Sequence, residues 1–308
     1  MWYTIPIIKR KQGKIKMNFT VTAQEAGMTV KEYLRRRSVS ATCLRTLKQK
    51  ENGITRNGTH CTVRAVLQEG DCLCIAVEDH MITDRTPLTA SQTVPILYED
   101  DDVLVVDKPW GMPTHQSHGH RGDTLSDVVL SMPNAPSVFR AVNRLDADTS
   151  VVVLLARNRL AANFLCARMA AGEIQKEYLA IVEKTPASPS GKMIDYIARE
   201  GESIIRRVTV AEGEGDYAEA DYETVSVHDA YTLLRLLPKT GRTHQLRVQL
   251  ASRGMPIVGD DFYGGSTALA RQALHAARLT FPHPNGSVIT VKSDLPRDML
   301  EILKKETP

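Results

Sequence analysis

The chain has 308 residues, of which 42% are apolar and 24% charged, so it has room for one large and one small domain with buried cores. The formal net charge of +3 is mildly basic, which does not by itself establish nucleic-acid binding. No stretch approaches the roughly eighteen apolar residues of a membrane span, and no signal-peptide pattern is present. We therefore expect a globular protein of the reducing cytoplasm, without membrane contact.

The first ninety-four residues divide by composition into an arm, a small module and a linker. Residues 1–17 are basic and predict an irregular arm, residues 18–80 predict a small α/β module, and residues 81–94 predict a linker. The elements predicted within the module are a helix over 30–37 capped by Thr29, a basic helix over 40–49, two short strands set off by Asn-Gly turns at 52–53 and 57–58, and a strand over 72–77. Cys72 and Cys74 share one face of that last strand and are expected to pack inward.

Residues 95–305 predict a second and larger domain. Its expected elements are a hairpin over 96–106, a long loop over 109–122, a helix over 123–130, a buried strand over 151–156, a helix capped by Asn158 and ended by Gly172, a strand over 178–182, two antiparallel strands over 218–227 and 231–237, and a helix over 243–252. These strands and helices interleave without regular βαβ spacing. That order favours the α+β class over a doubly wound sheet.

A short polar segment, residues 144–150, runs directly into the apolar stretch 151–156. Such an arrangement places a carboxylate on a rigid element beside a cleft. The alternative is an ordinary Asp–Thr turn paired with Arg144. Spacing alone does not choose between Asp146 and Asp148 as the reactive group.

A second polar cluster opens the predicted helix over 243–252. Arg242, Thr243 and His244 lie at its start, and His244 and Arg247 share one face. Free backbone N–H groups and an Arg at a helix start suit a phosphate. The alternative is a capped helix with a solvated basic face.

The loop 109–122 contains His115, His118 and His120, a pattern that raises the question of a metal. The segment offers no convincing fourth ligand and no nearby Cys, so we expect no metal site. The sequence contains no P-loop, GxGxxG or HExxH pattern, which leaves nucleotide-cofactor and zinc-protease functions without support.

Five segments resemble, in order, the motifs of the RluA family of pseudouridine synthases. They are residues 97–113 (opening strands and K-P-x-G loop), 144–150 (H-R-L-D-x-x-T-S-G), 176–178 (the motif with the active-site Tyr), 241–248 (G-R-T-H-Q-I-R-V) and 259–276 (G-D-x-x-Y-G and R-Q-x-L-H-A). The resemblance covers about residues 95–292. It implies a catalytic fold with a central mixed, mainly antiparallel sheet flanked by helices.

Residues 18–80 resemble the alpha-L RNA-binding module that precedes this catalytic domain in many family members. Gly27–Val30 and Val66–Asp71 carry this likeness, while Thr42 and Cys43 stand where relatives often have more Arg. The catalytic motifs depart from the family pattern at Asn143, Val151 and Gln249, which replace His, Gly and His. These departures bear on pocket shape and substrate identity more than on activity.

The resemblance implies an enzyme that isomerises uridine to pseudouridine, with Asp146 as catalytic carboxylate. Arg247 would keep that carboxylate ionised, and Tyr178 would stack on the uracil or relay a proton. The residues expected to bind substrate or RNA are Lys108, His115, Arg144, Arg242, Thr243, His244 and Leu246. The isomerisation involves no redox change, phosphate transfer or hydrolysis, so no cofactor is expected.

The implied partner is RNA, bound by a monomer. Large-subunit ribosomal RNA is the expected substrate, because relatives with the N-terminal module often act there, and tRNA is the alternative. One rival function is a non-catalytic RNA-binding or ribosome-assembly protein on the same fold. A glycosidic hydrolase is another, since Asp146 and Asp148 could mimic its two carboxylates.

Overall fold

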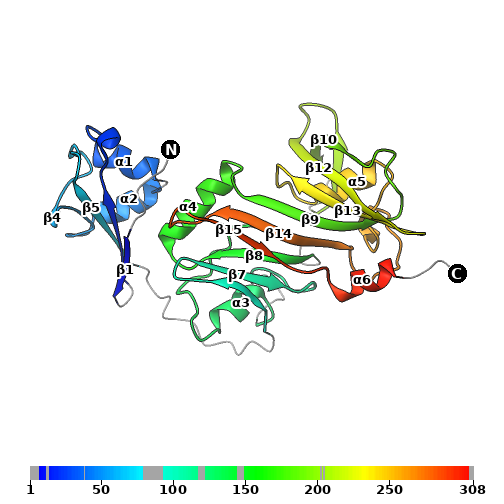
Figure 1. Ribbon diagram of the computed structural model, residues 1–308. Helices are drawn as coiled ribbons and strands as arrows, with labels where there is room; N and C mark the ends of the chain where they lie inside the picture. Colours follow the sequence, from blue (N-terminus) through cyan, green and yellow to red (C-terminus); the bar gives the residue numbers. More distant parts are fainter. Residues whose placement is uncertain are drawn as a thin grey trace.

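The computed structural model describes residues 7–11, 14–37, 39–78, 93–116, 122–143, 149–201, 203 and 205–304. In these residues the chain forms two separate sheets (Figure 1). The smaller sheet has five strands in the order β1-β2-β5-β3-β4, and the larger has ten. The larger sheet runs β11-β10-β12-β13-β9-β14-β8-β7-β6, with β15 paired to β14.

The small sheet and two helices make the N-terminal module. Its elements are β1 (Ile7–Lys11), β2 (Lys14–Thr20), α1 (Val30–Arg36), α2 (Ala41–Lys48), β3 (Ile54–Arg56), β4 (Thr59–His60) and β5 (Cys72–Glu78). Thr29 caps α1 through a capping box with Glu32, as the sequence predicts. The expectation of an irregular basic arm is wrong for residues 7–11 and 14–17, because β1 pairs antiparallel with β2, which in turn pairs with β5.

The module has its own apolar core. Phe19, Tyr33, Leu47 and Leu73 are among its buried residues, and Leu160 of α4 (Arg159–Ala170) packs into the same cluster. On β5 the core side is taken by the buried Leu73 and Ile75. Cys72 is exposed and Cys74 half-buried, so the expected inward packing of the two cysteines is wrong. Residues 81–92, most of the expected linker over 81–94, lie outside the described residues.

The second sheet carries the elements that position the site. In chain order these are β6 (Ile96–Glu99), β7 (Val103–Lys108), α3 (Leu125–Leu130), β8 (Ser150–Ala156), α4, β9 (Gln175–Val182), β10 (Ser190–Arg199), β11 (Arg207–Val210), β12 (Asp216–Val227), β13 (Thr232–Pro238), α5 (Gln245–Ser252), β14 (Leu274–Pro282), β15 (Val288–Lys292) and α6 (Arg297–Leu303). The described pairings are antiparallel except β14 with β8. The predicted α+β class with a mixed, mainly antiparallel sheet is therefore confirmed.

Both faces of the sheet at β8 are covered, which explains the continuous apolar run in the sequence. Val151, Val153 and Leu155 belong to the core that includes residues of α3, whereas Val152 and Leu154 belong to the core that includes residues of α4. Asn158 caps α4 by accepting a hydrogen bond from the Ala161 N–H at 2.9 Å. The strand and the capped helix both match the predictions from sequence.

Candidate active site

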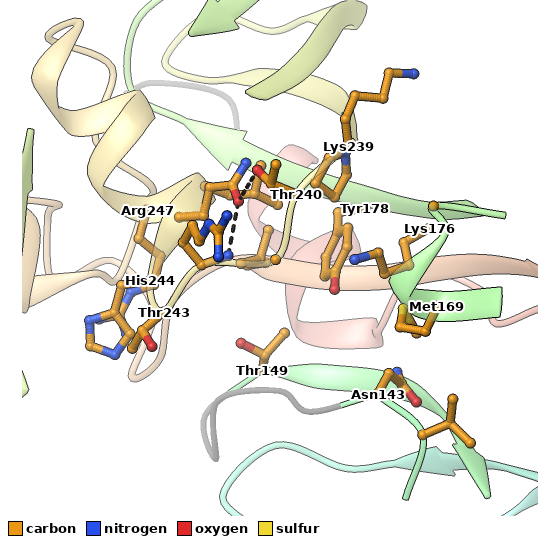
Figure 2. Close-up of a pocket in the computed structure, with 18 of the residues that line it drawn as sticks. Asn143, Thr149, Met169, Lys176, Tyr178, Lys239, Thr240, Thr243, His244 and Arg247 are labelled. Atoms are coloured by element: carbon orange, nitrogen blue, oxygen red, sulfur yellow. Dashed lines mark hydrogen bonds between the residues drawn. The ribbon is translucent and has the colours of Figure 1, made fainter. Parts of the chain in front are cut away.

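A cavity of about 660 Å³ lies where the start of α5 and its preceding loop face β9 and the residues next to β8 (Figure 2). It is lined by Val142, Asn143, Thr149, Met169, Ala170, Gly172, Lys176, Tyr178, Pro238, Lys239, Thr240, Gly241, Arg242, Thr243, His244, Gln245, Leu246, Arg247 and Leu274. This one space therefore collects Tyr178 and Arg247, for which the family resemblance implies catalytic roles. It also collects four of the residues predicted to bind substrate or RNA, namely Arg242, Thr243, His244 and Leu246.

Tyr178 stands in the middle of the sheet and faces the cavity. Its strand neighbours are Leu236 of β13 and Ala276 of β14, so its backbone is held on both sides. The side chain is buried, and Figure 2 shows its hydroxyl end directed into the cavity. A ring fixed in this way offers a flat apolar surface with one polar tip, which suits stacking on a pyrimidine.

Arg247 is buried on α5 and forms an ion pair with Asp260, a residue to which the sequence motifs gave no role. Its Nε donates to Asp260 Oδ2 and its Nη2 to Asp260 Oδ1, both at 2.7 Å. The two side chains are 9% and 0% exposed. A bidentate ion pair shielded from water fixes the plane of the guanidinium, because rotating the group would break one of the two parallel hydrogen bonds. Asp260 belongs to the G-D-x-x-Y-G segment, so the signal was present in the sequence without an assigned role.

Gln245 holds the loop that leads into α5. Its Oε1 accepts hydrogen bonds from the Thr240 hydroxyl at 2.7 Å and the Arg242 N–H at 3.0 Å, while its Nε2 donates to the Glu219 carbonyl at 3.0 Å. The preceding residue, His244, has a left-handed backbone with φ of 55°, so the helix begins at Gln245, two residues later than predicted. The cavity wall at 240–244 is thus fixed by a side chain of the helix itself.

The expected catalytic segment, residues 144–148 with Arg144, Asp146 and Asp148, lies outside the described residues. Its two described flanking residues, Asn143 and Thr149, both line the cavity. Asn143 is tied to β8, since its Nδ2 donates to the Val152 carbonyl at 3.1 Å and its Oδ1 accepts from the Leu154 N–H at 2.8 Å. The roles given to Asp146 and Arg144 stay predictions.

The other flank is held by the R-Q-x-L-H-A segment. Gln272 Nε2 donates to the Thr149 hydroxyl at 3.1 Å, and the Ser150 hydroxyl bonds His275 Nδ1 at 3.0 Å. Burial lowers the pKa of His275, which favours the neutral ring that can accept from Ser150. This segment, to which the sequence analysis gave no role, therefore anchors the chain directly after residue 148.

Two predicted RNA-binding residues do not line the cavity. Lys108 is fully buried, and its Nζ donates to the carbonyls of Pro109 at 3.0 Å and Met112 at 2.9 Å. In this position it holds the following loop in place, and the expected RNA contact of Lys108 stays a prediction. His115 is exposed and its ring lies edge-on to Phe139, with centroids 5.2 Å apart.

Two departures from the family pattern also lie away from the cavity. Val151 is fully buried in the core, and Gln249 donates to Asp195 Oδ2 at 2.7 Å. Neither side chain contributes to the cavity lining. Val151 and Gln249 therefore form no part of the cavity wall, whereas Asn143, the third departure, lines the cavity.

Lys176 is a cavity residue whose role the sequence analysis left open. A Cβ placed on Gly241 would lie 3.5 Å from its Nζ, so the amine reaches across the cavity toward the opposite wall. Burial lowers the pKa of this amine. A partly desolvated ammonium in this place favours an anionic or carbonyl-bearing ligand.

Among the described residues, no group of three or more His, Cys, Asp or Glu side chains is arranged to hold a metal ion. Searched over the same part of the chain, no helix has the length and apolar character needed to cross a membrane.

The comparisons with known proteins agree with the geometry. The family model described as RNA pseudouridylate synthase matches residues 102–252. The uncharacterized RNA pseudouridine synthase YjbO of Bacillus subtilis is 33% identical over 91% of this chain and 99% of its own length. Ribosomal large subunit pseudouridine synthase C of Escherichia coli is 30% identical over 92% and 95%.

A solved structure extends the likeness to three dimensions. Human RNA Pseudouridylate Synthase Domain Containing 1 superimposes with a TM-score of 0.56 and 26% identity, over 65% of this chain and 83% of that protein. Ribosomal large subunit pseudouridine synthase D of Xanthomonas campestris is 35% identical over 74% of each chain. The chain belongs to the RluA family and is an RNA pseudouridine synthase, an isomerase.

Proposed function

We propose that this enzyme isomerises uridines of large-subunit ribosomal RNA, with Asp146 as its catalytic carboxylate. The observation that carries the site assignment is the cavity in which Tyr178 and Arg247 meet beside Asn143 and Thr149, the neighbours of residues 144–148. A carboxylate supplied by that segment would complete a site with one acid, one guanidinium and one phenol.

The reaction breaks the bond between the uracil ring nitrogen and the anomeric carbon of the ribose. The ring then turns and a ring carbon bonds to the same anomeric carbon, losing its proton. No electrons enter or leave, so the site has to supply only an ionised carboxylate, a dry pocket and a hold on the freed ring. The carboxylate acts as a nucleophile on the sugar or as a base, and both roles need it ionised.

Arg247 is suited to keep that carboxylate ionised. Burial alone would push a carboxyl group toward its neutral form, and a guanidinium nearby opposes this because it stays charged. Asp260 fixes the guanidinium by binding Nε and Nη2. Leu246, 6% exposed in the same cavity, keeps water away from the sugar and so limits loss of free uracil.

The target uridine must leave its stack to enter the cavity, from a loop or a locally melted stem. Arg242 and Thr243 are exposed on the loop before α5, beside His244. Their position at the cavity supports a role in holding the phosphates on either side of the extruded nucleoside.

The ribosomal substrate is supported by two observations. Several relatives have names that include ribosomal large subunit pseudouridine synthase C or D. Residues 18–80, proposed to be an alpha-L-type RNA-binding module, expose Arg35 and Arg36 on α1 and Arg45 and Lys48 on α2. We propose that the enzyme acts as a monomer in the cytoplasm.

The decisive experiment maps pseudouridine in total RNA from cells with and without the gene, and from cells that express the Asp146→Asn variant. The proposal expects at least one large-subunit position to lose pseudouridine in both the deletion and the variant. The purified variant should bind RNA with nearly unchanged affinity. A lost position in tRNA would refute the ribosomal substrate, and normal turnover by Asp146→Asn would refute the catalytic assignment.

A further inference from the structure

A second, smaller cavity of about 320 Å³ adjoins the active-site cavity. The two share Gly241, Arg242 and Thr243 as a common wall. The rest of the second cavity comes from the antiparallel pair β10–β11 and from the start of β12: Ile197, Ala198, Arg199, Arg207 and Asp216. Its volume lies at the lower end of the range for ligand pockets, roughly 300–1,000 Å³.

Two arginines of this cavity face each other across the strand pair. Arg199 of β10 and Arg207 of β11 are direct antiparallel partners. Like charges in this position repel and destabilise the pairing. Arg199 makes no ion pair within the described part of the chain. Its neighbour Arg206 differs, because its Nε lies 3.1 Å from Glu200 Oε2. Arg207 Nη1 donates to the carbonyls of Ile205 at 2.8 Å and Arg206 at 3.0 Å, contacts that hold its side chain. An anion bound between Arg199 and Arg207 would offset the repulsion between the two positive charges.

The third arginine joins this pair to the active site. Arg242 lines both cavities, and its Nε donates to the Tyr217 carbonyl at 2.9 Å. Asp216 adds a hydrogen-bond acceptor to the second cavity. The cavity therefore combines three cationic donors with one acceptor, a set that suits a ribonucleotide: a phosphodiester for the arginines, and a ribose hydroxyl or base amine for the carboxylate.

We propose that the second cavity binds the nucleotide next to the extruded uridine, with the phosphodiester held by Arg199, Arg207 and Arg242. This inference rests on the proposed function in one respect, namely that the target uridine occupies the first cavity. It adds a subsite that binds the RNA backbone beside the target uridine. Such a subsite helps to hold the strand open while the ring turns.

The first test compares Arg199→Gln with the matched control Arg206→Gln, on an RNA that the wild-type enzyme modifies. Arg199→Gln should raise KM about tenfold, the scale expected for losing one charge-assisted contact, with kcat little changed. The slope of log kcat/KM against log salt should become shallower by about 0.7, as expected for one lost single-strand phosphate contact. Arg206→Gln should leave both quantities near the wild-type values.

Folding is checked without RNA. Removing a like-charge pair should leave the Tm of Arg199→Gln equal to or above that of the wild type, so a higher KM is not explained by unfolding.

The second test uses RNAs with one neutral methylphosphonate linkage at each position around the uridine. One linkage adjacent to the uridine should weaken wild-type binding about tenfold and Arg199→Gln binding hardly at all.

Arg199→Gln kinetics that match those of Arg206→Gln would overturn the subsite. The same conclusion would follow if every methylphosphonate affected the wild type and Arg199→Gln equally. Because both tests use whichever RNA the wild type modifies, they do not depend on a ribosomal substrate. A tRNA product would refute the proposed substrate and leave the subsite standing.

Discussion

The carboxylate of Asp260 should matter for the reaction although it is not expected to touch the substrate. Asp260→Asn keeps the shape of the side chain and removes the charge that holds Arg247 by two hydrogen bonds of 2.7 Å. The pair is almost fully shielded from water, with side-chain exposures of 9% and 0%. Breaking such a pair by changing one partner costs about 3–5 kcal/mol of unfolding free energy. We therefore expect a Tm lower by roughly 10 °C.

The effect on activity should exceed what instability explains. Without Asp260 the guanidinium is no longer held in one plane, and a misplaced group near the reacting atoms costs about a hundredfold in rate. Pseudouridine formation in single-turnover assays well below the Tm measures this loss in kcat.

Asp298→Asn is the matched control. Asp298 binds Arg271 through the same two-bond geometry, at 2.8 and 2.9 Å, and neither residue lines the active-site cavity. We expect Asp298→Asn to lower the Tm and to keep kcat. If Asp260→Asn retained the wild-type kcat at a temperature where it is folded, the reasoning about Arg247 would be wrong.

Three further predictions concern the Gln272–Thr149 contact, Lys176, and the basic residues of the N-terminal module. Gln272→Leu should lower kcat about tenfold, because it removes the hydrogen bond that holds Thr149. In a double-mutant cycle with Thr149→Val the two losses of kcat should not be additive, and additive losses would exclude a role for the contact. Lys176→Met should remove a pH dependence of the stability. Burial lowers the pKa of Lys176 below its usual value of 10.5, so between the two values the unfolded chain binds more protons than the folded chain. Urea melts should therefore show the wild type gaining stability relative to the variant as pH rises through the lowered value toward 10.5. Replacing Arg35, Arg36, Arg45 and Lys48 by Gln should weaken binding to large RNA and make the affinity less dependent on salt, with kcat on a short substrate unchanged. An unchanged salt dependence would argue against the module as an RNA contact.

Local patterns were sufficient where the structure depends on local contacts. The capping residues Thr29 and Asn158 and the apolar run of β8 each mark an element that the structure contains. The strands β10, β11, β14 and β15 and the helix α6 were not predicted. In β14 the sequence mixes His, Arg and Thr with apolar residues, and its strand conformation depends on β8 and β9, which are distant in the chain.

The same division applies to the site. Tyr178, Leu246 and Arg247 were predicted from motifs and share the cavity. Lys108 is buried, whereas a Lys at a strand end is usually exposed, and only the fold shows that its amine donates to two loop carbonyls. The partnership of Arg247 with Asp260 spans thirteen positions of sequence and is created by tertiary packing, which no local pattern reports.

The two sides of the cavity differ in how they are fixed. The α5 side is set by charged and amide contacts within one region, where Asp260 holds Arg247 and Gln245 holds the loop at 240–242. The opposite side depends on Asn143, which is tied to β8 by hydrogen bonds of 3.1 and 2.8 Å, and on Thr149, whose hydroxyl accepts a hydrogen bond from Gln272 at 3.1 Å. A pocket in which the uracil ring is detached, turns and is reattached must have a rigid lining, so that the ring stays close to the anomeric carbon. Because Asn143 and Thr149 are both anchored beside the cavity, changes at Gln272 or Asn143 should act on kcat before they act on RNA binding.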